Sequence, residues 1–298
     1  MKQKIIIMLV SLCIAILAFV PILSVKKDAK AAEWMKQIAD NTRIKEMSIP
    51  GTHDSGALYS FADVAGKCQD LTIEEQLHIG VRFFDIRLKL QDDEFVVVHG
   101  FVDQKLTFAE VINDIREFME KHPSETILMS IKKEDETVNS RLSFEEALAR
   151  DLKEYEYLFS CDSKLPETLG EMRGKVYLIS RYPGETMGIP AYENWKDSTT
   201  FNLGELYVQD NYCVLDTTVK IKDIQKTFEY SATNKDELVL NFASCYLDKA
   251  FPPSYAGTAA KDINEWLKEH LDEQQGTIGV VICDFITAEL AEAIYERN

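Results

Sequence analysis

Apolar and polar residues alternate along several short segments of the chain, as they do in strands that bury one face. The clearest segment is 81–90, where Phe84, Ile86, Leu88 and Leu90 alternate with charged residues. Strands are also predicted at 47–53, 96–98, 126–131, 176–180, 206–208, 238–242 and 277–283. Helical spacing of apolar residues predicts helices at 108–122, 143–157, 220–232, 259–271 and 288–296, and a helical turn at 72–78. Ser143 with Glu146 matches a capping box.

Eight strands with mostly helical connections over about 250 residues predict an α/β fold, a single-domain imperfect (β/α)8 TIM barrel. The connections after the first, second, fifth and sixth strands are irregular, so some helices are expected to be missing. A doubly wound open sheet is the alternative, but no Gly-rich nucleotide loop follows any strand to support it. A parallel barrel places its active site at the carboxyl ends of the strands.

The first 31 residues have the features of a secretory signal. Lys2 and Lys4 precede an unbroken apolar run at 5–20, and Ala29-Lys30-Ala31 supplies the small-x-small cleavage pattern. We therefore expect cleavage after Ala31, a secreted protein, and a single barrel domain at 32–298. An uncleaved membrane anchor is the alternative, although the apolar run is short for a span of ~20 residues.

The chain is strongly acidic, with a formal net charge of −17. Removing residues 1–31 takes away five lysines and one aspartate, which makes the charge −21. Such a charge argues against nucleic acid as a partner and against broad electrostatic docking on anionic bilayers. Five cysteines remain, with no C-x-x-C spacing, so small buried thiols are expected and one disulfide stays open.

The stretch 48–56, with the sequence SIPGTHDSG, ends the first predicted strand. Pro50 and Gly51 stop the strand, and Gly56 is expected to give the chain an unusual backbone angle. Between them lie His53 and Asp54, exposed at a strand end. A single His-Asp pair is weak evidence, because a histidine is more often structural than catalytic.

Many more chemically active residues stand at predicted strand ends: Asp85, Arg87, His99, Lys132, Arg181, Asp210 and Asp284. Two of the five histidines, His53 and His99, are at such ends, which indicates a paired general base and general acid near neutral pH. The other histidines are in helices or at helix ends, where a solvated role is expected: His78, His122 and His270.

Three cations, Arg87, Lys132 and Arg181, are expected to converge on the mouth of the barrel, the face formed by the carboxyl ends of the strands. The rest of the protein is strongly acidic. The three cations indicate an anionic ligand, most simply phosphate, although some pairing with the neighbouring aspartates is also expected. The four aspartates at strand ends could hold a divalent ion through oxygen ligands: Asp54, Asp85, Asp210 and Asp284. Because Arg87 lies two residues from Asp85 and supplies the positive charge itself, a site without metal or other cofactor is predicted.

Five stretches, 48–56, 83–88, 123–134, 208–212 and 281–285, resemble bacterial phosphatidylinositol-specific phospholipase C, in order along nearly the whole mature chain. The resemblance implies an imperfect barrel and these roles: His53 as general base, His99 as general acid, Arg87 as phosphate ligand, Asp54, Asp85 and Asp284 as supporting carboxylates, and Lys132, Arg181, Asp210 and Tyr212 as inositol ligands. Arg87 stands where calcium-dependent relatives hold a metal, which implies the metal-independent branch. The family's rim tryptophans have no obvious counterpart.

The resemblance also implies a reaction. His53, oriented by Asp284, would activate the inositol 2-hydroxyl of phosphatidylinositol, and His99, coupled to Asp54, would protonate the leaving group. The products would be diacylglycerol and inositol 1,2-cyclic phosphate, and glycosylphosphatidylinositol anchors share the cleaved bond. The alternatives are a glycerophosphodiester phosphodiesterase, which would need a divalent cation and a glutamate-rich site, and an inositol-lipid-binding module without turnover.

Partners expected from this reading are membrane phosphatidylinositol and, transiently, the bilayer itself, with the protein acting as a monomer. The loop 249–257 follows the seventh predicted strand and so lies at the mouth. Its two prolines would stiffen it and present Phe251 to the bilayer. Packing of Phe251 in the core is the alternative.

Overall fold

The computed structural model describes residues 29–60, 66–184, 186–248 and 256–298. The strands of its main sheet are β1 (Ile49–Thr52), β2 (Phe83–Gln91), β3 (Glu94–His99), β4 (Val102–Thr107), β5 (Ile127–Lys133), β6 (Phe159–Ser160), β7 (Val176–Arg181), β8 (Ile189–Pro190), β9 (Thr199–Leu203), β10 (Leu206–Asp210), β12 (Leu238–Phe242) and β14 (Val280–Cys283). A two-stranded sheet contains β11 (Cys213–Val214) and β13 (Tyr246–Leu247).

The helices are α2 (Ala29–Ala32), α3 (Ile73–His78), α4 (Phe108–Lys121), α5 (Phe144–Leu152), α6 (Leu169–Met172), α7 (Thr217–Thr233), α8 (Ala256–His270) and α9 (Ala288–Tyr295). Short 3-10 helices occupy Trp34–Gln37, Ile44–Glu46, Lys153–Tyr155 and Leu271–Glu273. The predicted helix at 143–157 is shorter than expected and continues as a 3-10 turn, but the capping box of Ser143 and Glu146 is present. None of the helices in the described ranges is long and apolar enough to cross a membrane.

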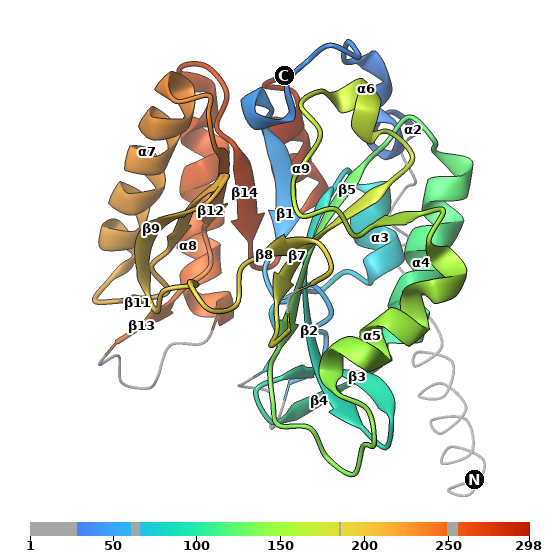
Figure 1. The fold of residues 1–298 in the computed structure, drawn as a ribbon. Helices are drawn as coiled ribbons and strands as arrows, with labels where there is room; N and C mark the ends of the chain where they lie inside the picture. The colour runs from blue at the N-terminus through green and yellow to red at the C-terminus, as the bar shows by residue number, and fades with distance from the viewer. Residues whose placement is uncertain (1–28, 61–65, 185, 249–255) are drawn as a thin grey trace, which may run out of the picture.

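The main sheet curls with the strand order β6-β7-β5-β2-β1-β14-β12-β10-β9 (Figure 1). Neighbours from β6 to β10 are parallel, and only β9 runs antiparallel to its neighbour on this path. Helices α4 and α5 lie on the side of β5 and β7, and α7 and α8 lie on the side of β10 and β12. The chain is thus an incompletely closed TIM-like barrel, which confirms the predicted fold class.

One of the eight predicted barrel strands is not part of the parallel set. The segment 96–98 lies in β3, which pairs antiparallel with β2 and with the unpredicted β4. The connection from β2 to β3 is only Asp92 and Asp93, whose φ angles of 56° and 63° suit a tight hairpin turn. Because a parallel crossover needs a dozen or more residues, this turn forces a hairpin, and His99 lies at the end of a ribbon.

Inward-facing residues change from apolar to charged along the barrel strands. On β2, Phe83 packs in the inner apolar cluster, whereas Asp85 and Arg87, two and four residues further on, meet other charged groups. On β5, Leu128 belongs to the same cluster and Lys132 lies at the strand end. The apolar part fixes the strands, and the charged part faces the carboxyl ends, where a barrel holds its active site.

The predicted signal cleavage point lies inside α2. Ala31 and Ala32 are buried, and the Arg82 side chain donates a hydrogen bond of 2.8 Å to the Ala32 carbonyl. Arg82 is itself fully buried and forms an ion pair of 2.9 Å with Glu125. The described chain therefore packs onto the barrel from α2 onward. The boundary at residue 31 stays a prediction.

All five cysteines in the described residues are free thiols. Cys68, Cys245 and Cys283 are buried, as expected, but Cys161 is exposed and Cys213 is half-buried. The disulfide that the sequence left open is therefore absent from this part of the chain.

Candidate active site

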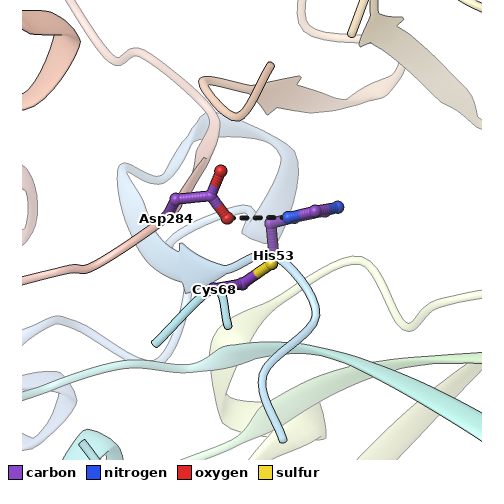
Figure 2. Close-up of side chains that lie close together, drawn as sticks. All are labelled: His53, Cys68 and Asp284. Atoms are coloured by element: carbon purple, nitrogen blue, oxygen red, sulfur yellow. Dashed lines mark hydrogen bonds and ion pairs between the residues drawn. The ribbon is translucent and has the colours of Figure 1, made fainter. Parts of the chain in front are cut away.

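His53 lies at the centre of a hydrogen-bonded row of three side chains. Nδ1 of His53, directly after β1, is 2.7 Å from Oδ1 of Asp284, directly after the neighbouring β14 (Figure 2). Nε2 of His53 is 2.7 Å from Nη2 of Arg87. Since a guanidinium can only donate, Nε2 accepts this bond and Nδ1–H donates to Asp284. The arrangement leaves the Nε2 lone pair as the basic site of the imidazole.

The turn after β1 differs from the sequence prediction at Gly56, whose φ is not positive. A Cβ at Gly56 would come within 2.7 Å of Cγ1 of Val97, so the position needs glycine for close approach of the β3 ribbon. The left-handed residue is Asp54, with φ of 41°. Aspartate tolerates this region better than most residues, and such strain is common at functional sites.

The turn after β14 holds Asp284 in a similar way. Phe285 has φ of 48°, which an aromatic residue rarely adopts. Its amide donates a hydrogen bond of 2.8 Å to the carbonyl of Cys68, and Nδ2 of Asn264 donates one of 2.8 Å to the carbonyl of Asp284. These bonds fix the backbone that aims the Asp284 carboxylate at His53.

Three carboxylates surround the Arg87 guanidinium. The closest oxygens are Oδ2 of Asp85 at 3.1 Å, Oε1 of Glu134 at 3.5 Å and Oδ2 of Asp54 at 3.6 Å. Burial raises the pKa of Asp54 to about 7, although the nearby Arg87 charge acts in the opposite direction. Burial also acts to raise the pKa of Asp85, but Arg87 and Arg181 together hold it well below its usual range.

His99 shares the Asp54 carboxylate with Arg87. Its Nδ1 is 3.0 Å from the Gly66 carbonyl and 3.7 Å from Oδ2 of Asp54. A carbonyl can only accept, so Nδ1–H is the donor and Nε2 remains for reacting atoms. Burial and the charge of Arg87 lower the pKa of His99.

The three predicted cations lie side by side across adjacent strands. Arg87 on β2 is in register with Lys132 on β5, which is in register with Arg181 on β7. Nζ of Lys132 is 2.6 Å from Oε2 of Glu134, a residue to which sequence reasoning gave no role. Burial and the charge of Arg87 lower the pKa of Lys132. Glu134 therefore links two of the cations and limits their mutual repulsion.

Trp195 covers the other wall of the site. Its ring stacks on the Arg181 guanidinium, with Cζ 3.7 Å from the ring centre, and its Nε1 donates a hydrogen bond of 3.0 Å to Oδ2 of Asp210. The hydroxyl of Tyr212 donates to Asp197, a bond that raises the pKa of Tyr212. Trp195 and Asp197 belong to the irregular connection before β9, where no periodic pattern marks a functional residue.

A cavity of about 450 Å³ opens among these side chains. Eight of the ten predicted catalytic and inositol-binding residues line it: His53, Arg87, His99, Lys132, Arg181, Asp210, Tyr212 and Asp284. The other two, Asp54 and Asp85, are buried and contact Arg87 from behind. Cys68 and Trp195 also line the cavity. Phe251, predicted at the rim, lies outside the described residues.

The three remaining histidines are at helix ends as expected, but each is only partly exposed to solvent. His78 packs edge-on against Phe118 and against His122, with ring centres 5.7 and 6.1 Å apart. His270 stacks on Trp266 at 5.0 Å. All three are half-buried, so their role is packing at the outer helices, away from the cavity.

Metal-ligand types also come together at the cavity. Two groups have ligand atoms within 4.8 Å of one another: His53 with Cys68 and Asp284, and Asp54 with Cys68 and His99. Arg87 contacts His53 in the first group and Asp54 in the second, so its positive charge is next to both. A catalytic site without metal stays a prediction.

Comparison with known proteins identifies the family of the chain. The family model for the phosphatidylinositol-specific phospholipase C X domain matches residues 47–182. A Staphylococcus aureus protein named 1-phosphatidylinositol phosphodiesterase is 32% identical over 233 residues, 71% of this chain and 74% of its own length. A Listeria monocytogenes protein of the same name is 27% identical over 285 residues, 92% of this chain and 87% of its own length.

Solved structures show the same fold. A variant of phosphatidylinositol-specific phospholipase C from S. aureus superposes with a TM-score of 0.79 and 28% identity, covering 89% of this chain and 97% of the other. The L. monocytogenes phospholipase, 24% identical, has a TM-score of 0.75 and covers 90% of this chain and 98% of its own, which supports the fold alone. The chain therefore belongs to the bacterial phosphatidylinositol-specific phospholipase C family of enzymes.

Proposed function

We propose that the protein is a secreted, monomeric phospholipase C that releases diacylglycerol from phosphatidylinositol and forms inositol 1,2-cyclic phosphate without a metal. The observation that carries this proposal is the position of Arg87, whose guanidinium contacts Nε2 of His53 and shares Oδ2 of Asp54 with His99. Such a site has a base for the attacking hydroxyl, a fixed cation for the phosphoryl oxygens and an acid for the leaving oxygen. These three groups match the charges that develop in phosphodiester cleavage.

His53 acts as the general base. Its Nε2 takes the proton of the inositol 2-hydroxyl, and the imidazolium that forms is stabilised by the Asp284 carboxylate at 2.7 Å. The oxygen freed in this way attacks the neighbouring phosphorus within the same molecule. An intramolecular attack needs no ordered water and benefits from proximity.

Arg87 and His99 stabilise the negative charge that develops on the phosphoryl oxygens and on the leaving glycerol oxygen. When phosphate enters, the Arg87 donor that now contacts His53 Nε2 turns to the phosphoryl oxygens, where negative charge grows. His99, protonated at Nε2, gives this proton to the glycerol oxygen that leaves. Asp54 and the Gly66 carbonyl orient the imidazole through Nδ1.

The inositol ring is bound by cavity-lining side chains other than the two histidines. Lys132 and Arg181 supply donors to ring hydroxyls, Asp210 supplies an acceptor, and Tyr212 closes the side of the cavity. Because Trp195 lies over Arg181, the guanidinium is held flat and its remaining donors point in fixed directions. Glycosylphosphatidylinositol anchors share the cleaved bond and are candidate substrates.

Product analysis tests this function and its metal independence. With phosphatidylinositol as substrate, the enzyme is expected to form diacylglycerol and inositol 1,2-cyclic phosphate at a rate unchanged by chelator, since Arg87 supplies the positive charge. Phosphatidylcholine should not react, because its head group has no hydroxyl on the carbon next to the one that carries the phosphate. Loss of activity with chelator and its return with calcium would contradict the role of Arg87. Tight binding without turnover would favour a lipid-binding module.

Exposed apolar side chains near the cavity offer a route to the bilayer. Phe101, in the turn after His99, is 83% exposed, and Leu215, after β11, is 66% exposed. Tyr246 lines the cavity and is 44% exposed. With a net charge of −17 for the whole chain, general attraction to anionic lipid is not available. We propose that these side chains, with Phe251 as predicted, make the transient membrane contact.

Phe101→Ser is expected to weaken binding to phosphatidylinositol vesicles several-fold and to lower activity on them, because apolar area is lost from the rim. Hydrolysis of soluble inositol cyclic phosphate and the melting temperature should stay close to those of the unchanged protein. The matched control is Tyr157→Ser, an aromatic residue 55% exposed just before β6, at the opposite ends of the strands. Equal vesicle binding by both variants would remove Phe101 from the membrane contact.

A further inference from the structure

Cys68 lies between the two catalytic pairs, and the mechanism gives its thiol no role. Its Sγ is 3.6 Å from Nδ1 of His99 and lies within 4.8 Å of ligand atoms of His53 and Asp284 (Figure 2). The side chain lines the cavity although very little of it is exposed. Burial raises the pKa of the Cys68 thiol well above its usual value, so the group is a neutral thiol at physiological pH.

Asp54 is the second unusual group at this place. Its side chain is fully buried, and within the described residues neither carboxylate oxygen has a hydrogen-bond partner. One oxygen is 3.7 Å from Nδ1 of His99 and 3.6 Å from Nε of Arg87, distances of ion pairs without direct hydrogen bonds. Buried polar atoms are nearly always hydrogen-bonded. An unsatisfied carboxylate beside a thiol and an imidazole points to a ligand that all three can share.

The spacing of these groups fits a small tetrahedral cation. Zinc binds sulfur at about 2.3 Å and nitrogen or oxygen at about 2.0–2.2 Å, so neighbouring ligand atoms of a tetrahedral site are separated by about 3.3–3.6 Å. The Cys68–His99 distance of 3.6 Å and the His99–Asp54 distance of 3.7 Å are close to such edges. Cys68 and His99 both line the cavity, from which water or a substrate oxygen could take the fourth position.

We propose that Cys68, His99 and Asp54 form an inhibitory site for a thiophilic divalent cation such as Zn²⁺. Binding displaces the thiol proton to solvent, and the neutral imidazole moves its proton from Nδ1 to Nε2 when Nδ1 becomes a ligand. The inhibition rests on the proposed function, because a metal-bound imidazole no longer exists as the imidazolium that His99 needs as general acid. Binding itself does not rest on it.

The alternative group of His53, Cys68 and Asp284 is less suited. Asp284 already accepts a hydrogen bond of 2.7 Å from His53, which a cation would have to replace, whereas the Asp54 oxygens have none to lose. Two costs oppose the chosen site: the bond from His99 to the Gly66 carbonyl breaks, and the Arg87 charge is near Asp54. Only a soft cation gains enough from a bond to thiolate to offset these two costs. Mg²⁺ and Ca²⁺ should therefore not bind there.

Cobalt binding tests the site without reference to activity. The purified protein is expected to show a thiolate-to-cobalt charge-transfer band on addition of Co²⁺, and Cys68→Ser should lack it. The matched control is Cys245→Ser, which removes another buried thiol of the same cavity and should keep the band. His99→Ala is expected to weaken Co²⁺ binding at least about tenfold, and His53→Ala should not.

Activity supplies the second readout. Zn²⁺ should inhibit phosphatidylinositol cleavage, and Cys68→Ser should raise the half-inhibiting concentration at least about tenfold, each protein being compared with its own metal-free rate. Equal inhibition of both proteins, or a band that depends on His53 and not on His99, would overturn the assigned ligands. A Cys68-dependent band in a protein that does not cleave phosphatidylinositol would support the site and reject the proposed function.

Discussion

Replacing either cavity histidine by alanine is expected to lower kcat by about 10²–10⁴-fold, the range for loss of a general acid or base. In the proposed mechanism, His53→Ala removes the acceptor for the 2-hydroxyl proton, and His99→Ala removes the donor to the departing glycerol oxygen. The measurement is steady-state turnover of phosphatidylinositol in detergent micelles, which keeps membrane binding out of the comparison. Circular dichroism and melting temperature establish that each variant is folded.

The leaving group separates the two roles. A substrate with a more acidic leaving alcohol needs less protonation, so it should restore much of the activity of His99→Ala and little of that of His53→Ala. His122→Ala is the matched control, because this histidine packs on Phe118 outside the cavity and its loss should leave kcat nearly unchanged. Equal rescue of both cavity variants would reject the assignment of base and acid.

Arg87→Lys is expected to lower kcat by about 10²–10³-fold, the loss seen when one donor to a developing oxyanion is removed. Lysine keeps the charge near Asp54 and Asp85, so the buried carboxylates stay compensated. It cannot reproduce the planar fork that reaches the carboxylates and phosphate together. Rates should be measured with a natural and an activated leaving group, and the loss should be similar with both.

The control for Arg87→Lys is the same change at Arg181. This second arginine also pairs with Asp85, at 3.3 Å, but its guanidinium stacks on Trp195, at the part of the cavity proposed to bind inositol. Arg181→Lys should therefore raise KM more than it lowers kcat. A larger kcat loss at Arg181 than at Arg87 would mean that phosphate binds at the other end of the row of cations.

The regular part of the fold could be predicted from the sequence because its strands and helices carry local signals. The strand at 238–242 has the predicted bounds, and the alternation in 81–90 correctly predicts a strand, whose apolar residues Phe84, Ile86 and Leu88 pack in the core. The antiparallel pairing of β3 with β2 and β4 was not predicted, because the periodicity of a strand does not indicate its direction. The direction of β3 follows from the length of one turn, Asp92 and Asp93.

The site could be predicted as far as strand ends determine it. Register places Arg87, Lys132 and Arg181 side by side, as convergence of strand ends predicts. Glu134 and Trp195 could not be assigned in this way. The first is one of many acidic residues in an acidic chain, and the second lies within a long irregular connection whose path depends on tertiary packing.

The proposed base and the proposed acid are supported by parts of the fold that differ in local stability. His53 follows β1, which has a partner on each side in the middle of the sheet, whereas His99 ends a ribbon whose outer strand β4 pairs only with β3 in the described sheet. Segments with fewer neighbours open at a lower free energy than the global one. Mild heating should then populate molecules with an intact base and a displaced acid. These molecules should still cleave substrates whose leaving group needs no protonation, but they should cleave natural lipid slowly. The ratio of the two rates should therefore change before the barrel unfolds.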